Sequence, residues 1–152
     1  MDIKKAYETV QKKYQLPSFE DLNKNFEISD IEEETFLLRE IRKKIDDKVD
    51  TARCMLEEVL QPDTTLAGIY ESRAFSDDEK GELFDLYRKL MKLHRQAFEL
   101  LMKNDDVLDA AFICHVAHIW EKFKKDLSDK TQKLQKSWEK DIEDNEKVGY
   151  FG

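Results

Sequence analysis

Residues 76–103 read SDDEKGELFDLYRKLMKLHRQAFELLMK, and this stretch decides the fold class. Ser76 and Glu79 have the spacing of a capping box, in which the two side chains bind each other's backbone amides at the start of a helix. Apolar residues then recur at three- and four-residue steps as far as Lys103, which is the period of an amphipathic helix. They form two adjacent stripes, so the helix is expected to lie centrally against at least two neighbours. The first stripe contains Leu83, Leu86, Leu90, Leu93, Ala97 and Leu100, and the second contains Phe84, Tyr87, Met91, His94, Phe98 and Leu101.

The same period continues on both sides of this segment. It predicts a long helix at about residues 30–60, opened by a second capping box at Ser29 and Glu32. A third long helix is expected at about residues 105–144. The fold class that follows is all-α, a helical bundle with these three long helices, about 30–60, 77–103 and 105–144, plus short N-terminal and connecting helices.

The short helices are predicted from local signals. Apolar residues at helical spacing indicate a first helix over about residues 2–14, and Ser18 and Thr65 are suitable N-caps for two more. The first helix and the outer part of the last one both carry narrow apolar seams, so we expect these two segments to pack together.

Composition limits the size and class of the protein. The 152 residues suit one domain, which we place at residues 1–147, with a short C-terminal tail at residues 148–152. Only 4 Gly and 2 Pro are present, too few for the frequent turns of a sandwich or barrel. Charged residues make up 39% of the chain, a fraction typical of long solvated helices.

Charge and hydropathy narrow the setting. The 26 basic and 34 acidic residues give a net charge of −8, which disfavours a general polyanion binder. The sequence lacks both an apolar run long enough to cross a membrane and an N-terminal apolar core like that of a signal peptide. We therefore expect a cytoplasmic protein that does not contact membranes. The two cysteines, Cys54 and Cys114, are expected to be free and buried, and no cofactor is implied.

One residue pair resembles a catalytic signature. Arg88 and His94 have the R-x5-H spacing, similar to the loose R-x4–6-H signature of HEPN-type nucleases, which are small helical bundles. The resemblance implies that the arginine stabilises a phosphate and that the histidine is a general acid–base for RNA cleavage. Lys89 departs from the family pattern, because a small polar residue is usual there, and the pair lies on the middle helix instead of near the end. The alternative is that Arg88 is solvated and His94 packs in the second apolar stripe.

A metal site and a basic surface are the other candidates on the last helix. His115 and His118 are three residues apart and so share a helix face, which allows a metal site with a helper such as His94. A di-iron bundle is excluded because no histidine is preceded by Glu at the third position. Nucleic acid could bind a basic flank of this helix, although a solvated flank has the same composition. That flank contains Lys122, Lys125, Lys133, Lys136 and Lys140.

The leading functional hypothesis is a non-enzymatic helical protein-interaction module. Leu134, Trp138 and Ile142 continue a seam with nearly heptad spacing, which is typical of helices that pair with other helices. The sequence lacks a glycine-rich phosphate loop, a nucleophile elbow and an HExxH motif. We therefore expect binding to another protein or self-association, with a nucleic-acid-associated protein, a HEPN-like RNase using Arg88 and His94, as the alternative.

Two further resemblances cover part of the chain. The segments 16–22, 37–45 and 86–91 resemble small uncharacterised all-helical proteins of archaea, which implies a helical fold and no particular activity. Separately, residues 38–46, with Arg39 and Arg42, resemble the first helix of all-α chorismate mutases. The later basic and acidic positions that hold the dicarboxylate substrate in that family have no clear counterpart in this chain.

Overall fold

The computed structural model describes residues 2–63 and 65–148, with side chains as far as residue 139. This part of the chain is all-helical and confirms the predicted bundle with three long helices, of which α3, α5 and α6 are the members. The helices are α1 (Ile3–Tyr14), α2 (Phe19–Phe26), a 3-10 turn η1 (Ile28–Asp30), α3 (Leu37–Leu60), α4 (Leu66–Arg73), α5 (Asp77–Lys103) and α6 (Asp106–Val148).

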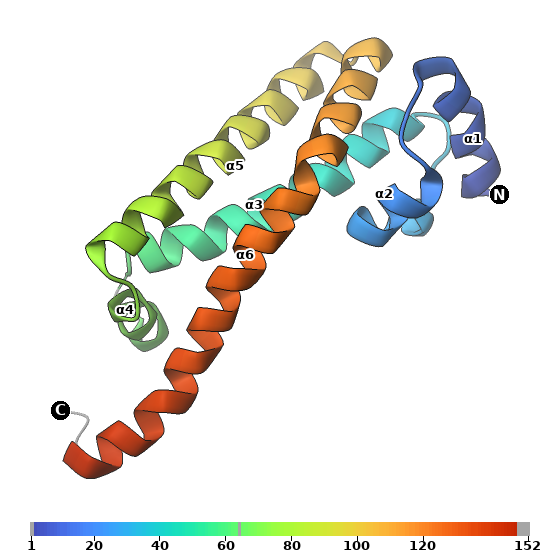
Figure 1. Ribbon diagram of the computed structural model, residues 1–152. Helices are drawn as coiled ribbons and strands as arrows, with labels where there is room; N and C mark the ends of the chain where they lie inside the picture. Colours follow the sequence, from blue (N-terminus) through green and yellow to red (C-terminus); the bar gives the residue numbers. More distant parts are fainter. Residues whose placement is uncertain (1, 64, 149–152) are drawn as a thin grey trace.

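Helix α3 is the centre of the bundle, with α5 along one side and α6 crossing it (Figure 1). Helices α1 and α2 lie at the N-terminal end of α3, and α4 turns the chain from α3 into α5 at the other end. Ile45 of α3, Leu90 of α5 and Ile113 of α6 are each fully buried where the three helices meet. Burial of one such side chain stabilises the fold by about 1.5–3 kcal/mol, so the shared core holds the long helices together.

Helix α5 has the caps that its sequence predicts. The Ser76 hydroxyl accepts from the Glu79 amide at 3.2 Å, and the Glu79 carboxylate accepts from the Ser76 amide at 3.0 Å. At the other end Asn104 adopts a left-handed conformation with φ 52°, which stops the helix after Lys103. The predicted caps Ser18 and Thr65 also bind the first turns of α2 and α4.

The predicted start of the second long helix at residue 30 is wrong, because α3 begins at Leu37. The Ser29 amide binds the side chain of Asn23 at 2.8 Å, so the expected capping box with Glu32 does not form. Ile28 and Ile31 are both buried, and a continuous helix from residue 30 would not hold the two side chains in the core as the 3-10 turn does. The intervening acidic residues therefore lie in an exposed connection and cap no helix.

The last helix is continuous from Asp106 to Val148, with no break at Ser128. Its expected partner is wrong, since the outer part of α6 packs on α4 and α5 and not on α1. The Tyr70 and Trp138 rings stack with centroids 4.1 Å apart, and the Tyr70 hydroxyl donates to the Ser137 carbonyl at 2.5 Å. Helix α1 instead lies at the far end of the bundle, against α2 and α3 (Figure 1).

The cysteines are free, but the expectation that both are buried is wrong. Cys54 is exposed on α3, and Cys114 is half-buried on α6. Burial raises the pKa of the Cys114 thiol. Across residues 2–63 and 65–148, no helix has the length and hydropathy needed to span a bilayer.

Candidate functional site

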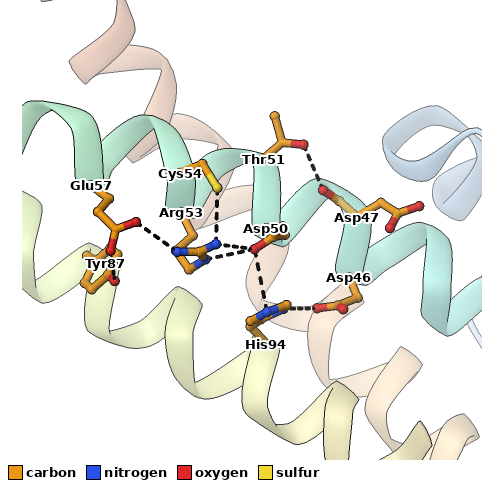
Figure 2. Close-up of polar contacts among 9 residues, drawn as sticks. All are labelled: Asp46, Asp47, Asp50, Thr51, Arg53, Cys54, Glu57, Tyr87 and His94. Carbon is orange, nitrogen blue, oxygen red and sulfur yellow. Dashed lines mark hydrogen bonds and ion pairs between the residues drawn. The ribbon is translucent and has the colours of Figure 1, made fainter. Parts of the chain in front are cut away.

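The predicted catalytic histidine lies in a polar cluster between α3 and α5, which we call the α3–α5 cluster (Figure 2). His94 projects from α5 between two carboxylates of α3. Its Nδ1 lies 2.7 Å from Oδ1 of Asp46, and its Nε2 lies 3.6 Å from Oδ1 of Asp50. The other members of the cluster are Arg53, Glu57 and Tyr87.

The remaining contacts of the cluster join the same two helices. Arg53 binds Asp50 at 2.7 Å and Glu57 at 3.2 Å, and the hydrogen bond from Asp50 raises the pKa of Arg53 further above its usual range. The Tyr87 hydroxyl of α5 donates to Glu57 at 2.9 Å. Arg53 also contacts the sulfur of Cys54 at 3.2 Å. Each polar group of the cluster thus has a partner within it.

This geometry suits a structural role better than a catalytic one. A general base must present a free nitrogen to its substrate, whereas both ring nitrogens of His94 face carboxylates. The carboxylates are themselves partly exposed, with side-chain exposures of 27% for Asp46 and 41% for Asp50. The cluster therefore acts as a polar seam that fixes the register of α5 against α3.

Arg88 lies outside the cluster. It is exposed on α5 and has no hydrogen bond or ion pair with any described residue. Six residues separate it from His94, and at 100° per residue the two side chains leave the helix in directions about 120° apart. The structure therefore does not bring the predicted Arg–His pair into one site.

The histidines of α6 point to solvent. His115 and His118 are both exposed, while the proposed helper His94 is engaged between α3 and α5. Within the described residues no group of three or more His, Cys, Asp or Glu side chains has the arrangement of a metal site.

The predicted basic flank of α6 is divided among different surroundings. Lys133 forms an ion pair with Glu79 of α5, whereas Lys122, Lys125 and Lys136 have no ionic partner among the described residues. Lys140 has a side chain outside the described part.

The predicted interaction seam is used within the chain for part of its length. Leu134 is buried and belongs to the hydrophobic core. Trp138 is 40% exposed, stacks on Tyr70 and donates its indole N–H to Glu71 at 3.1 Å. The side chain of Ile142 lies outside the described residues.

A buried ion pair that the sequence did not reveal links α3 to α6. Arg42 and Asp109 are 2% and 0% exposed, and their side chains join through one hydrogen bond of 2.8 Å. The second guanidinium nitrogen, Nη2, and the second carboxylate oxygen, Oδ2, have no hydrogen-bond partner among the described residues. Burial raises the pKa of Asp109, although Arg42 acts in the opposite direction. Arg42 is thus held by a carboxylate of its own chain, which removes it as the substrate arginine that the chorismate mutase resemblance suggested.

Large apolar side chains are exposed where α5 turns into α6, a surface that we call the hairpin end. Phe98, Leu101 and Met102 project from the last two turns of α5 with exposures of 57%, 43% and 70%. Val107 and Leu108 follow in the first turn of α6 with exposures of 63% and 37%. The sequence signal was the width of the apolar face of α5, but the analysis assigned that face to neighbours within the chain.

Comparison with known proteins adds no further assignment. No protein-family model matches the chain, and no curated protein and no solved structure is similar to it. The function is therefore inferred from the residues and their geometry.

Proposed function

We propose that the chain is a non-enzymatic helical protein-interaction module, which binds another protein or a second copy of itself through the hairpin end. The observation that carries the proposal is the concentration of five large exposed apolar side chains within residues 98–108. Clustered apolar side chains on a surface mark interaction sites more often than single ones do.

The two stripes of α5 explain why this surface is free. The first stripe is buried against α3 and α6, as the exposures of Leu83 (1%), Leu90 (0%) and Ala97 (3%) indicate. The second stripe, however, is half-exposed at Phe84 (50%) and Phe98 (57%). The sequence predicts two neighbours for a face this wide, and a binding partner would supply the missing one.

A non-enzymatic role is consistent with the rest of the structure. The most promising acid–base residue, His94, has both ring nitrogens directed at carboxylates. Arg88, its expected catalytic partner, leaves α5 in a different direction, so nothing favours the nuclease alternative over the interaction module.

The test compares two matched double variants by light scattering after gel filtration and by cross-linking in a lysate. Phe98→Gln with Met102→Gln removes the apolar surface of the hairpin end. Leu66→Gln with Ile69→Gln removes two exposed apolar side chains of α4, which are 74% and 37% exposed, and is the control. We expect the wild type and the control to form a dimer or a defined cross-linked complex, and the hairpin-end variant to lose it.

The proposal fails if the wild type is monomeric at all concentrations and its cross-linked products match those of the hairpin-end variant. It also fails if the α4 control loses association to the same extent, because the effect would then be one of general surface hydrophobicity.

A further inference from the structure

A groove between α5 and α6 combines an apolar floor with unpaired positive charge. Its volume is about 310 Å³. Leu86, Leu93 and Phe123, each at most 7% exposed, form the floor together with the half-buried Ile119. The exposed side chains of Lys89, Lys92 and Lys122 line the groove, from α5 on one side and α6 on the other.

The position of the groove follows from the way the two helices run. Helices α5 and α6 are close at the hairpin end and diverge away from it (Figure 1). Farther along, two pairs of long side chains bridge them, Lys130 to Glu82 at 2.7 Å and Lys133 to Glu79. The groove lies between the hairpin end and these bridges, where α3 closes the space from behind and side chains of α5 and α6 face each other.

The charge of the groove is unbalanced. Lys89, Lys92 and Lys122 have no hydrogen bond or ion pair with any described residue. Asp126 is the one carboxylate that lines the groove beside them. Three positive side chains gathered around one negative charge are unusual in a protein whose net charge is −8. An anion is therefore the missing partner of these lysines.

We propose that this groove binds a single-chain aliphatic carboxylate, a fatty acid, whose hydrocarbon chain lies on the floor and whose carboxylate pairs with the three lysines. A volume of about 310 Å³ is at the lower end of small-molecule sites. It does not admit an α-helix, which is about 10–12 Å across with its side chains. The apolar floor distinguishes the site from one for a free inorganic anion, because Leu93 and Phe123 would contact no part of such a ligand.

The test titrates the ¹⁵N-labelled full chain with dodecanoate below its micelle concentration and follows the amide resonances. We expect shifts to concentrate in residues 86–96 and 115–126. A calorimetric series from octanoate to dodecanoate is expected to tighten by up to about fourfold for each methylene that reaches the floor. Dodecanol, which has the same chain without the charge, should bind the wild type at least tenfold more weakly than dodecanoate.

Matched lysine variants separate the groove from general electrostatics. The groove variant carries Lys89→Gln, Lys92→Gln and Lys122→Gln. The control replaces three exposed lysines that do not line the groove, Lys12, Lys125 and Lys136, and so changes the net charge equally. We expect the groove variant to bind dodecanoate at least tenfold more weakly, and the control and the wild type to agree within twofold.

The inference is overturned if dodecanoate shifts no resonances in the two segments, or if both triple variants lose affinity equally. Tighter binding of inorganic phosphate or an RNA oligomer than of dodecanoate would also overturn it, because the groove would then be a polyanion site. The proposal does not depend on the hairpin end, so the Phe98→Gln, Met102→Gln variant should retain wild-type affinity for dodecanoate.

Discussion

Replacing Asp109 by leucine is expected to destabilise the fold more than replacing Arg42 by methionine, although both changes break the same hydrogen bond. The pair is 0% and 2% exposed, so either change leaves a charge that has lost its partner inside the bundle. A buried carboxyl group can become neutral by taking up a proton. A guanidinium group cannot lose its charge at accessible pH, so Asp109→Leu leaves the larger penalty.

The magnitude follows from the cost of an uncompensated buried charge. Breaking such a pair from one side costs about 3–5 kcal/mol, and we assign the upper end to Asp109→Leu and the lower end to Arg42→Met. In a chain of this length about 3 kcal/mol lowers Tm by roughly 10 °C. The double variant should recover most of the loss, since Arg42 Nη2 and Asp109 Oδ2 are unpartnered in the wild type and an apolar pair has no such atoms.

The pH dependence distinguishes the two single variants. Burial raises the pKa of Asp109 above its ordinary value of 3.8, and Arg42→Met removes the neighbour that opposes this rise. A carboxyl group with a raised pKa in the folded state contributes stability that is present below pH 3.8 and lost as the pH rises through the folded pKa. The penalty of Arg42→Met should therefore shrink as the pH falls from 7 towards 4, while that of Asp109→Leu should not.

The measurement is urea unfolding at pH 7 and pH 5, followed by circular dichroism at the helical band for the wild type, both single variants and the double variant. The reasoning is refuted if the double variant loses the sum of the two single losses, because the charges would then not be coupled. Equal penalties for the two single variants at both pH values would refute the argument that protonation relieves Asp109.

Three further predictions concern local features of the fold. Ser76→Ala should lower the free energy of unfolding by about 1 kcal/mol, because the first turn of α5 loses its cap, whereas Ser76→Asp should retain wild-type stability in the same thermal scan. An aromatic disulfide reagent should modify the exposed Cys54 at least tenfold faster than the half-buried Cys114, whose pKa is raised by burial, and Cys54→Ser should remove the fast phase. The hydrogen bond from Lys133 lowers the pKa of Glu79 from 4.5 to about 2, so its contribution to stability is present above pH 4.5 and lost as the pH falls towards 2. Lys133→Met should move the Glu79 titration, measured by carboxyl NMR, back towards 4.5, and an unchanged titration would contradict the ion pair.

The parts of the fold that could be predicted are those that depend on neighbouring residues. The capping box at Ser76 and the C-terminal signal at Asn104 act within one turn of the helix that they bound, so their spacing alone placed α5. The start of α3 was misplaced because Ser29 and Glu32 have the same spacing, while the buried side chains of Ile28 and Ile31 impose a different backbone. A local motif therefore fails where tertiary burial selects another conformation.

The contacts that bear on function depend on helix register, which periodicity does not provide. Arg42 and Asp109 are 67 residues apart, and each reads in the sequence as an ordinary charged residue on a helix. His94 likewise reads as a lone histidine in an apolar stripe, although two turns of α3 supply Asp46 and Asp50 to its ring. Amphipathic spacing shows which face of a helix is covered but not which residue of another helix covers it.

The apolar surface of α5 makes the same limit informative. Its sequence requires cover for two stripes, and the fold covers the first with α3 and α6 but leaves Phe84 and Phe98 half-exposed. The divergence of α6 from α5 leaves room for a groove on one flank of α5, whereas the uncovered stripe and the hairpin end face away from α6. A ligand in the groove would rest on Leu93 and Phe123, which lie on α5 and α6, and would hold the two helices at a fixed spacing. Since the hairpin end is formed by these same helices, occupancy of the groove is expected to change the affinity of the hairpin end for its partner, and equal affinities with and without dodecanoate would separate the two surfaces.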